Sequence, residues 1–169
     1  MIETRDKIIN RLHHHLQLPI IPNTETRNRP KYPFVDYNVI TLIPFNGAGN
    51  YSWGGNNDDV AVIKETQPKV SISFNSYSRD ETEAYTLAKQ VYDYFSHIGV
   101  TELEGIAVVS VSEIANRTIL EIDKYEVRYG LDVIFRFKDS ITRIDPEIKS
   151  YSIEREEFQW DINKILKLI

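Results

Sequence analysis

Three adjacent histidines, His13-His14-His15, are the side chains in this sequence most easily taken for a metal site. Successive residues of a helix point about 100° apart around its axis, so three in a row cannot converge on one ion. A helical zinc site instead uses histidines four positions apart with a glutamate nearby, and that spacing is missing here. We therefore predict a solvated helix end at this position.

Other motifs that could carry chemistry are incomplete. Gly47-Ala48-Gly49 and Gly54-Gly55 could suggest a phosphate cradle, but they form neither the Gly-x-Gly-x-x-Gly fingerprint nor a glycine loop followed by the P-loop lysine. The Gly-x-Ser-x-Gly turn of serine hydrolases does not occur. Adjacent acids such as Asp58-Asp59 carry little information in a chain with 25 acidic residues. The absence of cysteine excludes disulfides, thiol catalysis and cysteine-bound zinc. We expect no catalytic residue, no metal and no cofactor.

The composition indicates one globular domain whose charge is unevenly distributed. The chain has 169 residues, of which 41% are apolar and 27% charged, and its net charge is −5. Residues 1–33 hold six basic and three acidic groups, whereas residues 34–144 hold ten and sixteen. A basic N-terminal segment on an acidic body suggests contacts between copies or with another acidic partner, and ordinary solvation is the alternative. No apolar run is long enough to span a membrane.

The first half of the chain predicts a helix followed by strands. Ile8, Leu12 and Leu16 recur at helical spacing, and Pro19 ends that helix. A proline-rich connector leads to a strand over residues 34–43, in which every second residue from Val35 to Ile43 is expected to share one face. Residues 46–59 show no apolar periodicity and predict a long loop between two strands. Pairing should resume over residues 60–65, and residues 69–76 alternate as a half-buried strand does.

The second half contains the clearest helix and an unusually long alternating run. Ser78 to Glu81 fits a capping box before a helix over residues 80–97, and Gly99 stands where a left-handed cap is expected. A strand over residues 106–112 follows. Alternation then continues from Tyr125 to Lys138, where Gly130 suggests a bend or bulge. Residues 147–157 predict an edge strand.

Seven large apolar residues end the chain, and they must be buried on their own sheet or on another subunit. They are Phe158, Trp160, Ile162, Ile165, Leu166, Leu168 and Ile169. The predicted fold class is α+β: an antiparallel or mixed sheet with a long central strand, two helices packed on one face, and a C-terminal apolar tail or short helix.

Several strings resemble the tail-terminator, or neck, proteins of tailed phages. They are the strand end Val39-Ile40-Thr41-Leu42-Ile43-Pro44, the strand Val70–Tyr77 running into a helix with Glu83-Ala84-Tyr85, and the strand Tyr125–Val133. The resemblance spans roughly residues 1–145, which we take as a terminator-like domain. The loop at 46–59 and residues 146–169, a C-terminal extension, are not part of it.

The resemblance implies a non-enzymatic protein of the virion neck, assembled in the host cytoplasm. Such proteins form a homo-hexameric ring that caps the tail tube and joins the head–tail connector. In contractile phages they also meet the sheath. Genomic DNA passes through the ring without specific binding, and no membrane is involved. A connector, an adaptor or a tail tube protein is the alternative; a small-molecule-binding α+β domain is another.

Seven residues are candidates for contacts between subunits or with partners. Arg27, Arg29 and Lys31 carry the positive charge of the N-terminal segment, which could face an acidic neighbour. Tyr51 and Trp53 lie in the 46–59 loop, and Phe158 and Trp160 lie in the C-terminal tail. Aromatic side chains dominate the energetics of protein interfaces, so Trp53 is the expected anchor, with a local role inside the loop as the alternative.

Overall fold

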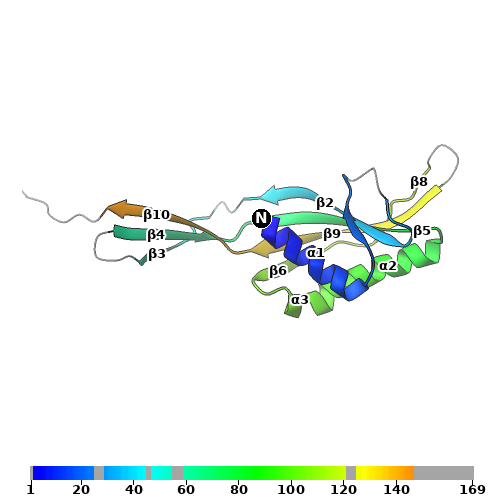
Figure 1. The fold of residues 1–169 in the computed structure, drawn as a ribbon, viewed down its shortest axis with the longest axis horizontal. Coiled ribbons are helices and arrows are strands. Elements are labelled where there is room, and N and C mark those ends of the chain that lie inside the picture. The colour runs from blue at the N-terminus through cyan, green and yellow to red at the C-terminus, as the bar shows by residue number, and fades with distance from the viewer. Residues whose placement is uncertain (1, 25–28, 45–46, 55–58, 121–124, 147–169) are drawn as a thin grey trace, which may run out of the picture.

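The elements follow one another as a helix, strands, helices and further strands (Figure 1). The computed structural model describes residues 2–24, 29–44, 47–54, 59–120 and 125–146. The helices are α1 (Ile2–Leu16), α2 (Glu81–Asp93), the π-helical turn η1 (Tyr94–Ile98) and α3 (Gly99–Glu102). The strands are β1 (Ile20–Pro22), β2 (Phe34–Ile43), β3 (Asn50–Gly54), β4 (Asp59–Thr66), β5 (Lys69–Ser78), β6 (Ile106–Val111), β7 (Ala115–Asn116), β8 (Ile119–Leu120), β9 (Tyr125–Phe137) and β10 (Asp139–Pro146).

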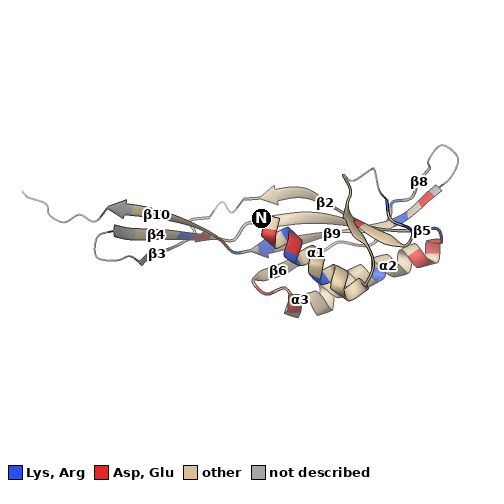
Figure 2. Cartoon of the chain, viewed as in Figure 1, with Lys and Arg blue, Asp and Glu red and all other residues tan. Residues whose placement is uncertain are grey.

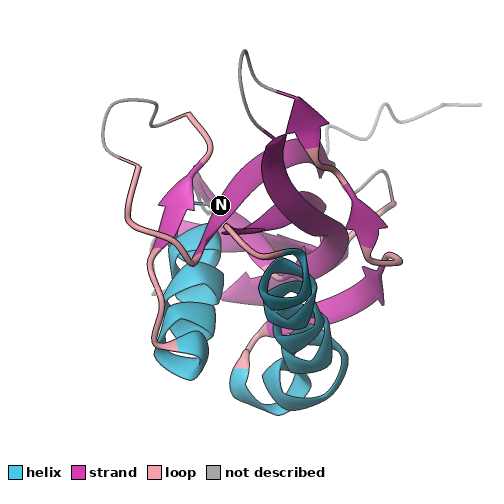
Figure 3. Cartoon of the chain, turned by 90° about the vertical axis from the view of Figure 1, so that its right-hand side faces the viewer, coloured by secondary structure: helices cyan, strands magenta, loops and turns pink. Residues whose placement is uncertain are grey.

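The larger sheet has the order β1-β2-β5-β9-β6, and the short strands β7 and β8 also pair with β9. All its pairings are antiparallel except that of β1 with β2. The helices cover one face of this sheet, as the view along the long axis makes clear (Figure 3). The predicted α+β class is confirmed, with β9 as the long central strand.

The core lies between the helices and the sheet, and the sequence periodicity accounts for it. Ile8 and Leu12, one helical turn apart on α1, are fully buried. The rings of Phe74, Phe95 and Phe135 meet with centroids 5.0 and 5.2 Å apart, which joins β5, η1 and β9. The other core residues include Val35, Val70, Ile72, Leu87, Val91, Tyr94, Leu103, Leu131, Val133 and Phe137.

Two local predictions at helix ends were wrong, and the bulge suggested at Gly130 is absent. The N-cap of α2 is Asp80, whose side chain accepts from the Glu83 backbone N–H at 2.9 Å, so the cap lies two residues after the one predicted. Gly99 has φ −62° and continues the helix; a Cβ there would lie 3.0 Å from the Tyr94 ring. The pairing of β9 with β5 shows no register shift at Gly130. A glycine is needed at this position because a Cβ would collide with the Asn75 and Arg117 side chains.

Strands β2 and β6 of the larger sheet each contain one extra residue. Ile40 interrupts the pairing of β2 with β5, and Val109 interrupts that of β6 with β9. The bulge at Ile40 moves Thr41 and Ile43 to the face opposite Val39, so the predicted single face from Val35 to Ile43 was wrong. Bulges twist an edge strand and oppose its pairing with another sheet.

A second sheet projects from this body. Strands β10, β4 and β3 pair in that order, all antiparallel, and we call these three strands the arm. It lies at one end of the long axis, away from the helices (Figure 1). The predicted loop at 46–59 was wrong for residues 50–54, which form β3; periodicity was weak there because neither face of the arm is packed against a core.

Candidate protein-interaction surfaces

The arm presents an aromatic and basic face. Directly opposed residues share a face in antiparallel pairs, so Tyr51, Lys64 and Ile141 form one row and Trp53, Val62 and Arg143 the next. Trp53 is 70% exposed and Ile141 65%, and the Lys64 ammonium lies 5.8 Å from the centre of the Tyr51 ring. A cation beside open aromatic rings suits a partner that brings apolar and acidic groups.

The opposite face of the arm is also uncovered in this single chain. It carries Ile63 of β4 and Ile144 of β10, and Ile144 is 67% exposed. A sheet of three strands needs an apolar face packed on something to be stable in water. Its exposed apolar groups therefore make the arm a candidate surface for contact with another protein.

The base of the arm is tied to the body. β4 leads into β5 and β10 follows β9 after one residue, so the central strands of the larger sheet extend into the arm. The ion pair of Lys138 with Glu65, at 2.5 Å, spans this junction. Gly49 adopts φ +69°, and a Cβ there would lie 2.9 Å from the Glu65 carbonyl oxygen, so only glycine fits before β3.

The basic N-terminal segment is used partly within the chain itself. Arg29 forms an ion pair with Glu126, whose side chain is only 2% exposed, and its guanidinium lies 5.9 Å from the centre of the Tyr77 ring. Lys31 is exposed, whereas Arg27 lies outside the described residues. Of the three proposed contact residues, Arg29 thus has a role in its own fold although its side chain is 46% exposed, and Lys31 is exposed as well.

A buried polar network lies on the sheet face opposite the helices. Asp36 accepts hydrogen bonds from Asn75 at 2.7 Å and from the Tyr77 hydroxyl at 2.8 Å. Burial raises the pKa of Tyr77 to about 12, and the bond donated by Arg128 only partly opposes that effect. The face predicted to be solvated on β5 is therefore buried, because residues distant in sequence cover it.

Arg117 is the main side chain over this face, and sequence reasoning did not single it out. Its guanidinium donates to Ser73 at 2.6 Å and Asn75 at 2.9 Å, and it pairs with Asp132 at 2.9 Å. Burial alone would raise the pKa of Asp132, but bonds with Ser73 and Arg117 outweigh it and lower that pKa. A Cβ on Gly130 would lie 2.8 Å from the Arg117 guanidinium, which explains the glycine.

The remaining sequence candidates contribute no described site. His13 contacts the Leu18 carbonyl through Nδ1 at 2.7 Å, and the His15 ring lies 4.8 Å from that of Tyr94. Phe158 and Trp160 lie outside the described residues. Among the residues that are described, no three His, Asp or Glu side chains are grouped to hold a metal ion. None of the described helices has the length and apolar character that a membrane crossing requires.

Comparison with known proteins identifies the family. The profile described as "Phage neck terminator protein" matches residues 6–160, which includes the larger sheet, the arm and the stretch with Phe158 and Trp160. A comparison with curated proteins found no match. The match extends past residue 145, where the sequence resemblance stopped. Since it covers most of the chain, this protein belongs to the phage neck terminator family and is a structural protein of the virion neck.

Proposed function

We propose that copies of this chain form a closed ring, a hexamer as in the proteins it resembles, which caps the tail tube and joins it to the head–tail connector. The observation that carries this proposal is the arm, a sheet exposed on both faces. Such a sheet is an incomplete structure until another protein covers it. A terminator is this kind of component, because its work consists of contacts with copies of itself and with its neighbours.

Partner contact through the arm agrees better with the structure than polymerisation of the larger sheet. The bulges at Ile40 and Val109 disturb the edge strand β6 and the part of β2 beyond its short pairing with β1, so direct pairing of these edges between copies is disfavoured. The arm has no described bulge, and its aromatic face is open. We therefore place the contact with the tube or the connector on the arm, with Trp53 as its central side chain.

Contacts between copies are heterologous in a ring, so two different surfaces must match. Between Asp80 and Glu104 the sequence has six acidic residues and one lysine, and Figure 2 shows acids at the start of α2 and on α3. Lys31, with Arg27, is the complementary positive charge in this proposal. DNA passes through the ring without specific contacts; in a contractile phage the ring also meets the sheath, and assembly takes place in the host cytoplasm.

The test mixes the purified chain with its tail tube protein and examines the product by negative-stain electron microscopy and light scattering. We expect rings at tube ends and tubes that stop growing. Tubes that grow past unbound single chains would contradict the proposal. Filaments formed by the chain alone would favour the alternative of a tail tube protein, for which the arm would be the stacking element.

A paired variant locates the contact. Replacing both Trp53 and Ile141 by serine should abolish capping and leave the body folded, because both side chains are exposed. Leu120→Ser, at a 67% exposed position of β8 outside the arm and the acidic surface, is the matched control and should cap normally. Capping that survives the double substitution would move the contact away from the arm.

A further inference from the structure

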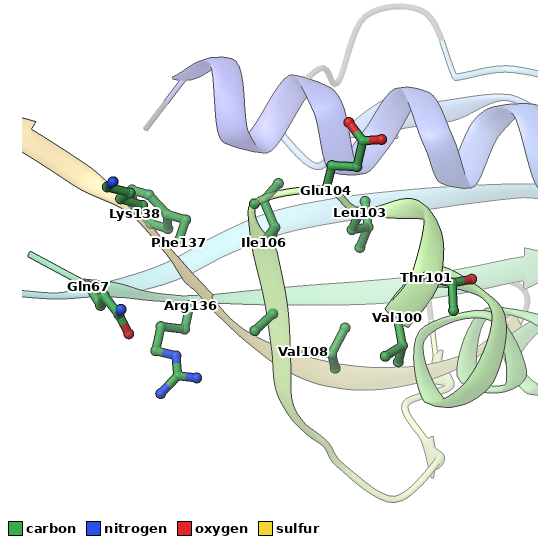
Figure 4. Close-up of a pocket in the computed structure, with 12 residues that line it drawn as sticks. Gln67, Val100, Thr101, Leu103, Glu104, Ile106, Val108, Arg136, Phe137 and Lys138 are labelled. Atoms are coloured by element: carbon green, nitrogen blue, oxygen red, sulfur yellow. The ribbon is translucent and has the colours of Figure 1, made fainter.

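A groove of about 440 Å³ opens beside the edge strand β6 (Figure 4). It lies where α3, β6 and the junction of β9 with β10 meet. Val100, Ile106, Val108 and Phe137 supply apolar groups, and Arg136 and Lys138 supply positive charge. This volume is sufficient for a few large side chains.

The groove has one exposed apolar residue on its wall, and one of its cations lacks a counterion among the described residues. Val100 is 56% exposed, whereas Ile106 and Phe137 are buried deeper in the groove. Lys138 pairs with Glu65, but within the described part of the chain Arg136 forms no ion pair. Aromatic rings combined with carboxylates are therefore the chemistry that fits.

The chain itself contains such a segment after β10. Residues 156–161 read Glu-Glu-Phe-Gln-Trp-Asp, with three acids and two aromatic rings in six positions. The family match extends to residue 160 and so includes both aromatic residues in the unit common to the family. We propose that this segment docks in the groove of its own chain, its rings against Val100 and Val108 and its carboxylates beside Arg136.

The available length of chain permits this. β10 has 8 residues and runs from beside Lys138 to Pro146, a distance of roughly 26 Å at strand spacing. Residues 147–157 can span roughly 36 Å when extended, which exceeds the distance back to the groove. A short covalent connection raises the effective concentration of the segment to the millimolar range, which favours this groove over that of another copy.

The docked segment would also cover the outer side of β6. That edge has no pairing strand among the described residues, and an open edge can template association with other chains. Docking within one chain therefore gives the free protein a protected edge. The proposal requires no ring and no tail tube, so it stands apart from the proposed function.

The test uses Trp160 as a reporter in the full-length Trp53→Phe variant, where it is the sole tryptophan. At high dilution, docking predicts a blue-shifted emission and quenching by acrylamide several-fold weaker than for a denatured sample. Arg136→Glu and Val100→Asp, both at exposed positions, should each shift the emission to the red and increase quenching. Circular dichroism checks that the body stays folded.

A charge reversal makes the test specific. Combining Arg136→Glu with Glu156→Arg and Glu157→Arg should restore the protected emission, whereas Lys31→Glu, a remote charge change, should leave it unaltered. A solvent-exposed Trp160 in the parent, or an emission indifferent to both groove variants, would overturn the proposal. Protection that disappears on dilution would also overturn it and place the segment on a second copy. Either failure leaves the tube-capping test unaffected.

Discussion

The body and the arm share long continuous strands, but the side chains of these strands are buried in the body and exposed in the arm. In the body, β5 and β9 pair along ten registered positions and have helices on one face and a polar network on the other. In the arm, the continuations of these strands have neither, and Trp53, Ile141 and Ile144 are each at least 65% exposed. Stability therefore resides in the body, while the arm keeps apolar surface available for binding.

This difference bears on the proposed contact through the arm, which has no core of its own. Its base continues directly from buried strands and is tied by Lys138 and Glu65, so its direction is set by the body. A partner then gains apolar contacts with a sheet already formed, which reduces the ordering cost of binding.

Phe135→Ala should be the most damaging change. The ring is fully buried and meets Phe95 at 5.2 Å, so truncation leaves a cavity that costs about 3–5 kcal/mol of unfolding free energy. Urea denaturation would show a lower midpoint with an unchanged slope. A loss below about 1 kcal/mol would mean that the body is not the stable half of the molecule.

Arg29→Glu should cost about 2–4 kcal/mol, because it places a carboxylate against the buried Glu126. Lys31→Glu, two positions away and exposed, should change stability by less than about 0.5 kcal/mol and serves as the control. Thermal denaturation of both, with Glu126→Gln as a rescue of the first, separates the effects. Equal losses in the two variants would contradict an internal role for Arg29.

The Lys31→Glu variant also tests whether the N-terminal segment acts between copies. If the N-terminal segment meets an acidic neighbour, Lys31→Glu should weaken ring assembly most at low salt, where screening is least. Assembly mass measured by light scattering over a salt series gives the result. An unchanged mass at every salt concentration would remove the segment from the interface.

Asp132→Asn should have a small effect that depends on pH. The pKa of Asp132 is lower in the folded protein than its usual 3.8, so its stabilising contribution is complete well above pH 4 and is lost as pH falls below that value. Its side chain is 39% exposed, which limits the contribution to less than about 1 kcal/mol. Urea midpoints of parent and variant should differ at pH 6 and converge toward pH 3; a constant gap would assign the effect to packing.

Trp53→Ser should have the smallest effect on stability, below about 0.5 kcal/mol, because the ring is 70% exposed in the single chain. It should nevertheless impair tube capping in the electron microscopy assay. Retained stability together with impaired capping would distinguish the exposed arm from the buried body most clearly. A stability loss close to that of Phe135→Ala would show that Trp53 is a local staple, the alternative considered from sequence.

Part of the structure could be read directly from residue spacing. The face of α1 with Ile8 and Leu12, the stripe of α2, and the alternation of β9 were all predicted, because burial on one side leaves a local periodic signal. Strand β3 was not, since Tyr51 and Trp53 stand among polar residues and small glycines. The Arg117 network was also missed, because a single arginine between two short strands has no distinguishing spacing.

Sequence alone thus determined the fold class, the positions of the main helices and strands, and a core that faces one side of the sheet. It also supported a resemblance to neck proteins that the family match bears out. The tertiary structure decided that residues 50–54 join an exposed arm, that Arg29 neutralises Glu126, and that Arg117 buries the polar face of β5. These facts depend on pairings and charges between segments far apart in the chain, and no local pattern of residues records them.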